Sequence, residues 1–91
     1  VLGGLKLSTI DAETQKQFRL PGEIIGILIS DVEPKSKAEK SGFQAGDVII
    51  QIEDIEIKNF ANVEAALKKY NNKYKRIYVN RYGQTILFVI Q

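Results

Sequence analysis

The sequence predicts an α+β fold that is mostly β, with short strands and two main helices. The chain has 91 residues, of which 44% are hydrophobic, enough for one compact domain with a modest core. Several short segments alternate apolar and polar residues or are rich in β-branched ones, as strands are. Two further segments, 36–39 and 59–72, carry helix signals. We therefore expect residues 1–91 to form a single domain.

The first strand and helix are predicted from the N-terminal part of the chain. Residues 4–9 alternate apolar and polar side chains, which is the period of a strand with one buried face. Asp11 is suited to cap a short amphipathic helix that buries Ala12 and Phe18 and ends at Pro21 and Gly22.

A buried strand and a short helix are expected next. Residues 24–32 form a short run rich in isoleucine, in which Gly26 marks a bulge or a close approach of two backbones. Ser36 and Glu39 have the spacing of a capping box, in which each side chain accepts a hydrogen bond from the other residue's backbone N–H. One or two helical turns should follow.

The stretch SGFQAGDVIIQI, residues 41–52, predicts a helix end, a tight turn and a strand start. Gly42 stands where a left-handed residue ends a helix, and Phe43 can fold back onto that helix. Gly46 allows a second residue with positive φ, and Asp47 can accept hydrogen bonds from backbone amides of the turn. The strand should then run over 48–52.

The remaining elements are a helix and two strands. A short acidic turn and strand follow residue 52, and residues 59–72 place apolar side chains at helical spacing. Segments 75–80 and 85–90 read as strands that are joined by a turn at Gly83.

The composition excludes several classes of activity. The chain has no cysteine and no histidine, so it lacks thiolate and imidazole ligands, disulfides and the usual nucleophile and base pairs. Glu53, Asp54 and Glu56 could suggest acid and base catalysis, but without a companion base we interpret them as a solvated turn. We predict no catalytic residue, no metal site and no cofactor. The longest apolar run, 24–29, is too short to cross a bilayer.

Charge is distributed unevenly. Residues 1–64 carry 7 basic and 11 acidic side chains, whereas residues 65–91 carry 6 basic and no acidic ones, which together give the net charge of +2. Basic and aromatic side chains alternate in this last third, a composition that can bind nucleic acids. Because the pattern crosses a helix, a loop and a strand, we favour a solvated surface or a contact with a neighbouring domain. The side chains are Lys68, Lys69, Lys73, Lys75, Arg76 and Arg81, with Tyr70, Tyr74, Tyr78 and Tyr82.

The order of elements and the run from Ser41 to Ile49, preceded by Ser36-Lys37-Ala38, resemble a PDZ domain of the permuted type found in HtrA (Deg) serine proteases. The resemblance covers essentially the whole chain. It implies a PDZ-like, partly open antiparallel β-barrel or sandwich. Termination soon after the last predicted strand and the incomplete glycine loop favour the second, C-terminal PDZ domain of such a protease. The opening without methionine suggests a fragment of a longer protein.

The same resemblance implies a peptide-binding site. A partner's C-terminus would add as a strand beside the first strand, and backbone amides of a glycine loop would hold its carboxylate. Two registers compete for the loop, Val1 to Gly4 and Leu2 to Leu5, and strand alternation favours the second because it points Leu5 and Leu7 into the groove. The resulting loop is Leu2, Gly3, Gly4 and Leu5. The predicted peptide-binding strand and pocket are Leu5, Lys6, Leu7, Ser8, Phe60, Val63, Glu64 and Leu67.

The implied function is that of a non-catalytic module. It would bind C-termini or unfolded segments and present them to a serine endopeptidase, or regulate it, in a periplasmic or secreted setting of protein quality control and stress response. The alternative is a domain that mainly assembles oligomers or contacts the neighbouring protease and PDZ domains. Nucleic-acid binding is the least favoured interpretation.

Overall fold

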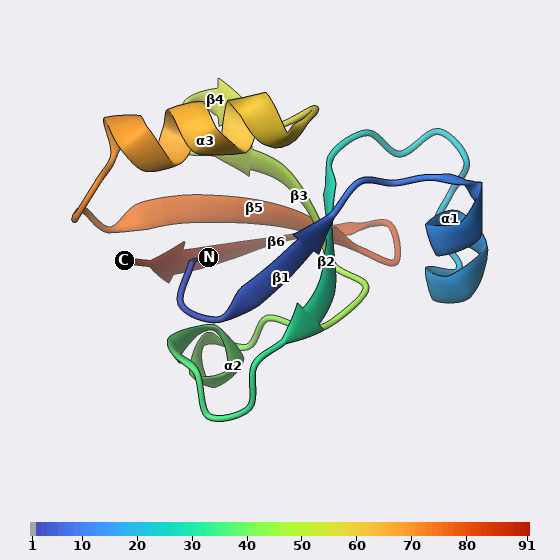
Figure 1. The fold of residues 1–91 in the computed structure, drawn as a ribbon, viewed down its shortest axis with the longest axis horizontal. Helices are drawn as coiled ribbons and strands as arrows, with labels where there is room; N and C mark the ends of the chain where they lie inside the picture. The colour runs from blue at the N-terminus through green and yellow to red at the C-terminus, as the bar shows by residue number, and fades with distance from the viewer. Residues whose placement is uncertain (1) are drawn as a thin grey trace.

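The structure is a computed structural model, and it describes residues 2–91. The sheet is open and antiparallel, and six strands and three helices occur in the described residues (Figure 1). The path β1-β2-β3-β5-β6 places β1 at one edge and β6 at the other, while β4 pairs only with β3. This arrangement confirms the predicted α+β fold with mostly β structure. The strands are β1 Leu5–Ser8, β2 Ile27–Val32, β3 Val48–Ile52, β4 Ile55–Glu56, β5 Lys75–Arg81 and β6 Gln84–Ile90.

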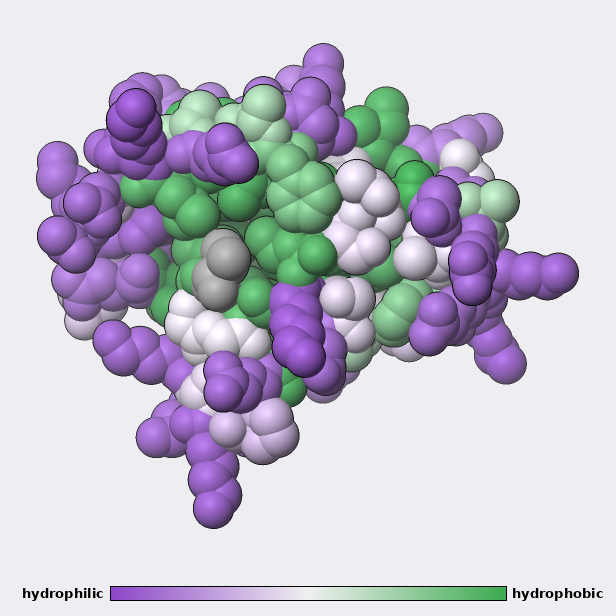
Figure 2. Space-filling model, viewed as in Figure 1, coloured by the Kyte–Doolittle hydropathy of each residue, from purple (hydrophilic) through white to green (hydrophobic). Residues whose placement is uncertain are grey.

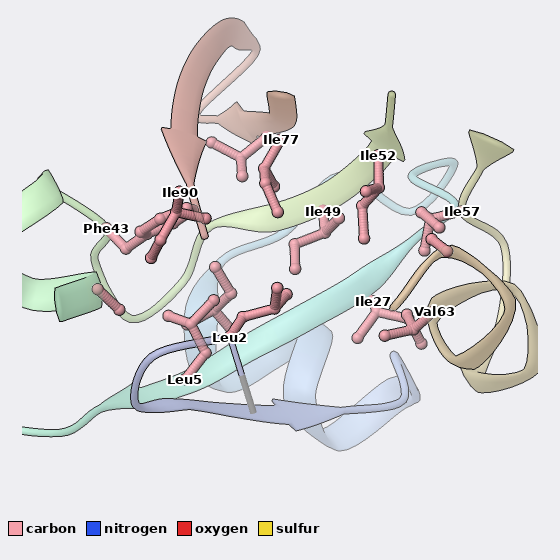
Figure 3. Packing of buried hydrophobic residues seen from close by; sticks show 14 residues of the cluster. Leu2, Leu5, Ile27, Phe43, Ile49, Ile52, Ile57, Val63, Ile77 and Ile90 are labelled. Atoms are coloured by element: carbon pink, nitrogen blue, oxygen red, sulfur yellow. The ribbon is translucent and has the colours of Figure 1, made fainter. Parts of the chain in front are cut away.

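The hydrophobic core packs the sheet against the helix α3, Phe60–Lys69, and also includes Ala38 of the short helix Lys37–Ser41 and the following Phe43. Ile27, Ile49 and Ile77 from three neighbouring strands are buried and point into it, and Val63 approaches from α3 (Figure 3). Because α3 contributes buried side chains to the core, its position relative to β1 is fixed by packing.

The helix α1, Ala12–Phe18, begins where predicted but contributes little to the core. Asp11 caps it, accepting a 2.8 Å bond from the N–H of Thr14, and this bond lowers the pKa of the Asp11 carboxyl. The helix has no buried residue, and it ends at Phe18 because Arg19 adopts φ of 55°. The predictions that it buries Ala12 and ends at Pro21 were therefore wrong.

The second strand begins later than the apolar run suggests. A Cβ atom built on Gly26 would collide with the carbonyl oxygen of Ile49, so the predicted close approach of two backbones is confirmed. The strand β2 starts after this contact, at Ile27. Ile24 and Ile25 lie outside the sheet, and the Ile25 side chain is 64% exposed.

The short helix α2, Lys37–Ser41, is capped at both ends. Ser36 accepts a bond of 3.1 Å from the N–H of Glu39, as predicted. The carboxylate of Glu39, however, accepts from the N–H of Lys35 and not from that of Ser36, which donates instead to Glu33 O, so this half of the predicted capping box was wrong.

The turn after α2 is held by an ion pair whose carboxylate is buried and whose guanidinium is partly buried. Gly42 and Gly46 have φ of 105° and 99°, as predicted, and Asp47 accepts a 3.0 Å bond from the N–H of Gln44. The carboxylate of Asp47, which is 2% exposed, also accepts two bonds of 2.8 Å from Arg81 on β5. Arg81 donates further to Gly42 O at 2.9 Å, so one side chain fixes the helix end and the turn together.

Candidate functional site

A groove of about 550 Å³ runs between β1 and α3. Figure 2 shows apolar surface gathered between these two elements, with hydrophilic residues around it. Its lining combines apolar side chains from both elements with a few polar ones. The lining residues are Leu5, Lys6, Leu7, Ser30, Phe60, Val63, Glu64 and Leu67.

The groove and the core share side chains. Leu5 and Val63 are buried in the core, whereas Leu7 and Leu67 are half-buried and pack against it. Phe60, at the start of α3, is 38% exposed. Sequence periodicity assigns such residues to a buried face but does not distinguish a groove floor from a core.

Two positions differ from the predicted site. Ser8 is not among the residues that line the groove, and its hydroxyl donates to the neighbouring Thr9 O at 3.1 Å. Ser30 takes part instead, and its hydroxyl donates to Lys6 O at 3.2 Å. In the pairing of β1 with β2, Lys6 lies opposite Asp31 and Leu7 opposite Ile29, so Ser30 is an extra residue on β2 that forms a β-bulge. No pattern in the sequence predicted this bulge.

Along the edge of β1 that faces away from β2, the backbone groups do not take part in the β1–β2 hydrogen bonds. Leu5 lies opposite Val32, and the N–H of Glu33 donates to Gly4 O at 2.8 Å. The two groups of a trans peptide point in opposite directions, so the N–H of Leu5 points away from β2. It therefore points toward the open edge of the sheet.

The glycine loop before β1 packs on α2. Leu2, Gly3 and Gly4 have φ of 51°, 74° and 114°, and the Leu2 side chain is buried. The N–H of Ala38 donates to Gly3 O at 3.0 Å, so the N–H of Gly4 points away from α2. A run of backbone N–H groups in such a turn can bind an anion. Neither glycine lines the groove in the described part of the chain.

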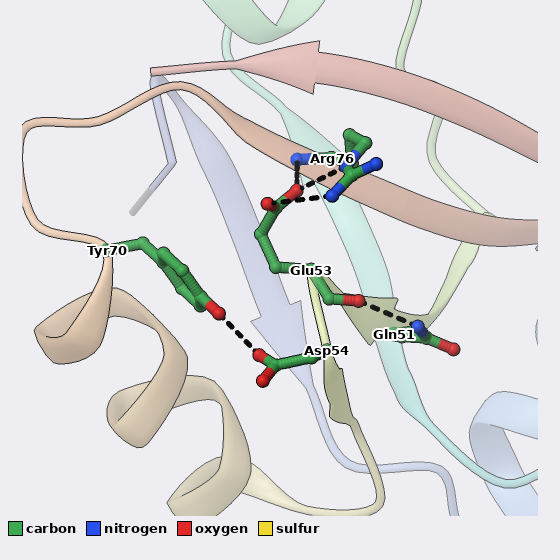
Figure 4. A network of polar contacts seen from close by, with 5 residues as sticks. All are labelled: Gln51, Glu53, Asp54, Tyr70 and Arg76. Carbon is green, nitrogen blue, oxygen red and sulfur yellow. Dashed lines mark hydrogen bonds and ion pairs between the residues drawn. The ribbon is translucent and has the colours of Figure 1, made fainter.

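Two acidic side chains at the β3–β4 turn bind β5 and the C-terminal end of α3 (Figure 4). Glu53 accepts bonds of 2.8 and 3.2 Å from the Arg76 guanidinium and 2.7 Å from its backbone N–H. Asp54 accepts from the hydroxyl of Tyr70 and, at 3.1 Å, from Lys69. These bonds join the turn to β5 and to the end of α3. The prediction of a solvated turn was wrong for Glu53, whose side chain is 17% exposed, whereas Asp54 is exposed as predicted, at 64%.

We expect thermal stability to fall as the pH is lowered below about 5. The bonds from Arg76 lower the pKa of Glu53 from its ordinary 4.5, and those from Tyr70 and then Lys69 lower that of Asp54 from 3.8. A carboxyl with a lowered folded-state pKa stabilises the fold above its unfolded-state pKa, and that contribution is lost as the pH falls through the folded-state value. Unfolding temperatures measured by circular dichroism across this range would show the decrease.

The variant Glu53→Gln should reduce this pH dependence. It removes one of these carboxylates, so its unfolding temperature should lie below that of the parent chain at pH 7, and the difference should shrink as the pH falls. Glu23→Gln, in the exposed loop before β2, is the matched control and should leave the curve unchanged. Parallel curves for Glu53→Gln and the parent would contradict this account.

The basic side chains of the last third do not form one free surface. Lys75 is buried and donates to Lys73 O and Gln91 O at 2.8 and 3.1 Å. Arg76, Arg81 and Lys69 each pair with a carboxylate. The predicted solvated surface was therefore wrong for Lys75, which is buried, and for Arg81, which is 22% exposed, whereas Lys69 and Arg76 are paired but still exposed.

Within residues 2–91, no cluster of three or more His, Cys, Asp or Glu side chains is arranged to hold a metal ion. None of the helices in this part of the chain is long and apolar enough to span a membrane.

Residues 28–81, more than half of the chain, match the sequence family described as PDZ domain. The chain belongs to the PDZ domain family. Its relatives include a protein of Haemophilus influenzae named "Probable periplasmic serine protease do/HhoA-like", 36% identical over 64 residues. A protein of Chlamydia pneumoniae named "Probable periplasmic serine endoprotease DegP-like" is 30% identical over 86 residues. These matches cover 70% and 94% of the PDZ chain but only 14% and 17% of the two relatives.

Solved structures share the fold. The HtrA-type protease AlgW, determined with a decapeptide, superposes with a TM-score of 0.81 at 24% identity, over 97% of the PDZ chain and 27% of its own. The HtrA3 PDZ domain bound to a phage-derived ligand (FGRWV) gives a TM-score of 0.77 at 21% identity, over 96% of the PDZ chain and 80% of its own. At these sequence identities, the two structures show a shared fold and no more.

Proposed function

We propose that residues 1–91 are one PDZ domain of an HtrA-type serine protease and that the groove between β1 and α3 binds the C-termini of peptides. The observation that carries the proposal is the open edge of β1, where the N–H of Leu5 points away from β2 beside an apolar groove. A peptide can add to such an edge as one more strand, antiparallel to β1. Two proteins with this fold were solved with a decapeptide and with a phage-derived ligand, which supports this use.

The carboxylate of the peptide would lie against the N–H groups of Gly3, Gly4 and Leu5. The carbonyls of Gly3 and Gly4 are bound to α2 and to the residue after β2, so the following N–H groups point away from these elements. Backbone donors at positive φ bind an anion without a charged side chain. The last side chain of the peptide would then enter the apolar part of the groove at Leu5, Leu7, Val63 and Leu67, which favours an apolar terminal residue.

In this proposal the domain is a non-catalytic module of a periplasmic or secreted protein. It would recruit unfolded substrates by their exposed C-termini, or regulate the protease when they bind, as protein quality control under stress requires. The sequence relatives named as periplasmic serine proteases support this setting.

A second candidate function is contact with another domain or subunit of the protease. It is supported by three large hydrophobic side chains that are exposed to solvent. These are Tyr74, Leu87 and Val89, which are 70%, 49% and 55% exposed. Two of them lie on β6, the edge of the sheet opposite to β1. Exposed apolar side chains on an edge strand suit a docking contact.

The test is a titration of the 91-residue chain with a library of peptides, each as the free acid and as the C-terminal amide. We expect free acids with an apolar last residue to bind with micromolar affinity, and their amides to bind at least about tenfold more weakly, because the amide removes the charge that the loop holds. Calorimetry gives both constants. Equal binding of acid and amide would overturn carboxylate capture, and failure of every peptide combined with self-association would favour the assembly function.

A further inference from the structure

A second hollow lies beyond the Ser8 end of the groove. It has a volume of about 280 Å³, and its apolar lining comes mainly from isoleucines. Ile25, one of these, is 64% exposed and is a large apolar side chain without cover on this face. The lining residues are Thr9, Ile10, Gln15, Ile24, Ile25, Gly26, Ile27, Lys58 and Asn59.

The hollow continues the line of the groove along both walls. On one wall, Leu7 lines the groove and Thr9 lines the hollow. On the other wall, Phe60 lines the groove and its neighbour Asn59, the N-cap of α3, lines the hollow. Figure 1 shows the segment before β2, drawn in cyan, extending toward this end of α3. A ligand that follows β1 toward its C-terminal end would therefore reach the isoleucines.

The register of a bound peptide can be counted along β1. A C-terminus held at Gly4 and Leu5 runs antiparallel to the strand, so its last residue lies beside Leu5 and its third-last beside Leu7. The extra residue of the β1–β2 bulge is Ser30 on β2, so the count along β1 is not interrupted. The fifth-last residue then lies beside Thr9. Because side chains alternate with a period of two, the last, third-last and fifth-last side chains point to the same face.

We propose that the hollow between Ile10, Ile25 and Asn59 binds the side chain of the fifth residue from the C-terminus of the peptide, and that it selects a large apolar side chain there. This inference rests on the proposed peptide binding in the groove and adds a determinant of specificity to it. The lining gives the chemistry, since isoleucines form the apolar part and polar side chains such as Gln15 and Lys58 complete the rim. A leucine of the ligand would cover the exposed side chain of Ile25.

The test uses acetylated heptapeptides that have valine at the last and third-last positions and serine at the other positions. One peptide has leucine at the fifth-last position, a second has alanine there, and a third has leucine moved to the fourth-last position. Calorimetry with the 91-residue chain should show that fifth-last leucine binds about tenfold more tightly than alanine, the gain expected for a mostly buried isobutyl group. Leucine at the fourth-last position should give no comparable gain, because its side chain points away from the hollow.

Variants of the chain locate the effect. Ile25→Ser should bind the leucine and alanine peptides equally, and it should fold normally because Ile25 is exposed. Leu87→Ser, also an exposed aliphatic residue but on β6, is the matched control and should keep the tenfold preference. Equal affinities for leucine and alanine with the parent chain, while free acids still bind better than amides, would overturn the hollow alone. Failure of all free acids to bind would overturn the groove and the hollow together.

Discussion

Replacing Asp47 by alanine is expected to destabilise the fold by about 3 kcal/mol, the lower end of the loss measured when one member of a buried ion pair is removed, because the remaining Arg81 is partly exposed. The Asp47 carboxylate is 2% exposed and accepts hydrogen bonds from Arg81 and from the N–H of Gln44. Without it, the guanidinium of Arg81, itself only 22% exposed, has no carboxylate beside it. Because small domains have total stabilities of about 5–15 kcal/mol, urea denaturation should show a much lower midpoint for Asp47→Ala.

Two further variants separate the buried pair from charge effects in general. Lys6→Ala breaks an exposed pair with Asp31, whose N–O distance is 4.0 Å, and should change stability by less than about 1 kcal/mol. The double variant Asp47→Ala with Arg81→Met removes both charges and should be more stable than Asp47→Ala alone. If Asp47→Ala cost no more than Lys6→Ala, the pair would not hold the turn as described.

This ion pair also illustrates what local sequence patterns leave out. The turn itself could be predicted, because Gly42, Gly46 and Asp47 act on their immediate neighbours through positive φ and short-range hydrogen bonds. Arg81 lies 34 positions from Asp47, and no periodicity or spacing relates the two. The sequence therefore placed Arg81 in a basic surface. The same reason explains Glu53 and Arg76, which lie 23 positions apart and meet only because β3 pairs with β5.

For the candidate site, the sequence indicated the two walls but not their details. Strand alternation and helical spacing placed Leu5, Leu7, Val63 and Leu67 on buried faces, and the resemblance to PDZ domains implied that these faces form a peptide-binding groove. Ser30 was missed because a bulge on β2 depends on the pairing of two strands and not on the strand alone. Ile25 was assigned to a buried strand because it lies in a run of isoleucines. The strand in fact starts only after the contact of Gly26 with Ile49, and a contact between residues so far apart in the sequence cannot be predicted from local patterns.

The largest effect on function is expected from Leu7→Lys, which should weaken the binding of free-acid peptides about a hundredfold or more. The ammonium group would have to lie in the apolar groove against the bound peptide, where an unpaired charge is costly. Leu7 is only half-buried, so in the unbound domain the longer lysine side chain can extend its charge into solvent and the fold should persist. A loop variant such as Gly4→Pro is less informative, because a Cβ atom at position 4 would collide with Ser36 at the start of α2.

Leu87→Lys is the matched change on the other edge of the sheet. Leu87 lies on β6 and is 49% exposed, so this variant alters the candidate assembly surface and leaves the groove intact. Calorimetry and sedimentation equilibrium should be measured on both variants. If the groove captures peptides, Leu7→Lys loses binding and Leu87→Lys keeps the affinity of the parent chain. Normal peptide binding by folded Leu7→Lys would contradict capture between β1 and α3, and loss of self-association in Leu87→Lys alone would then assign the domain to assembly through β6.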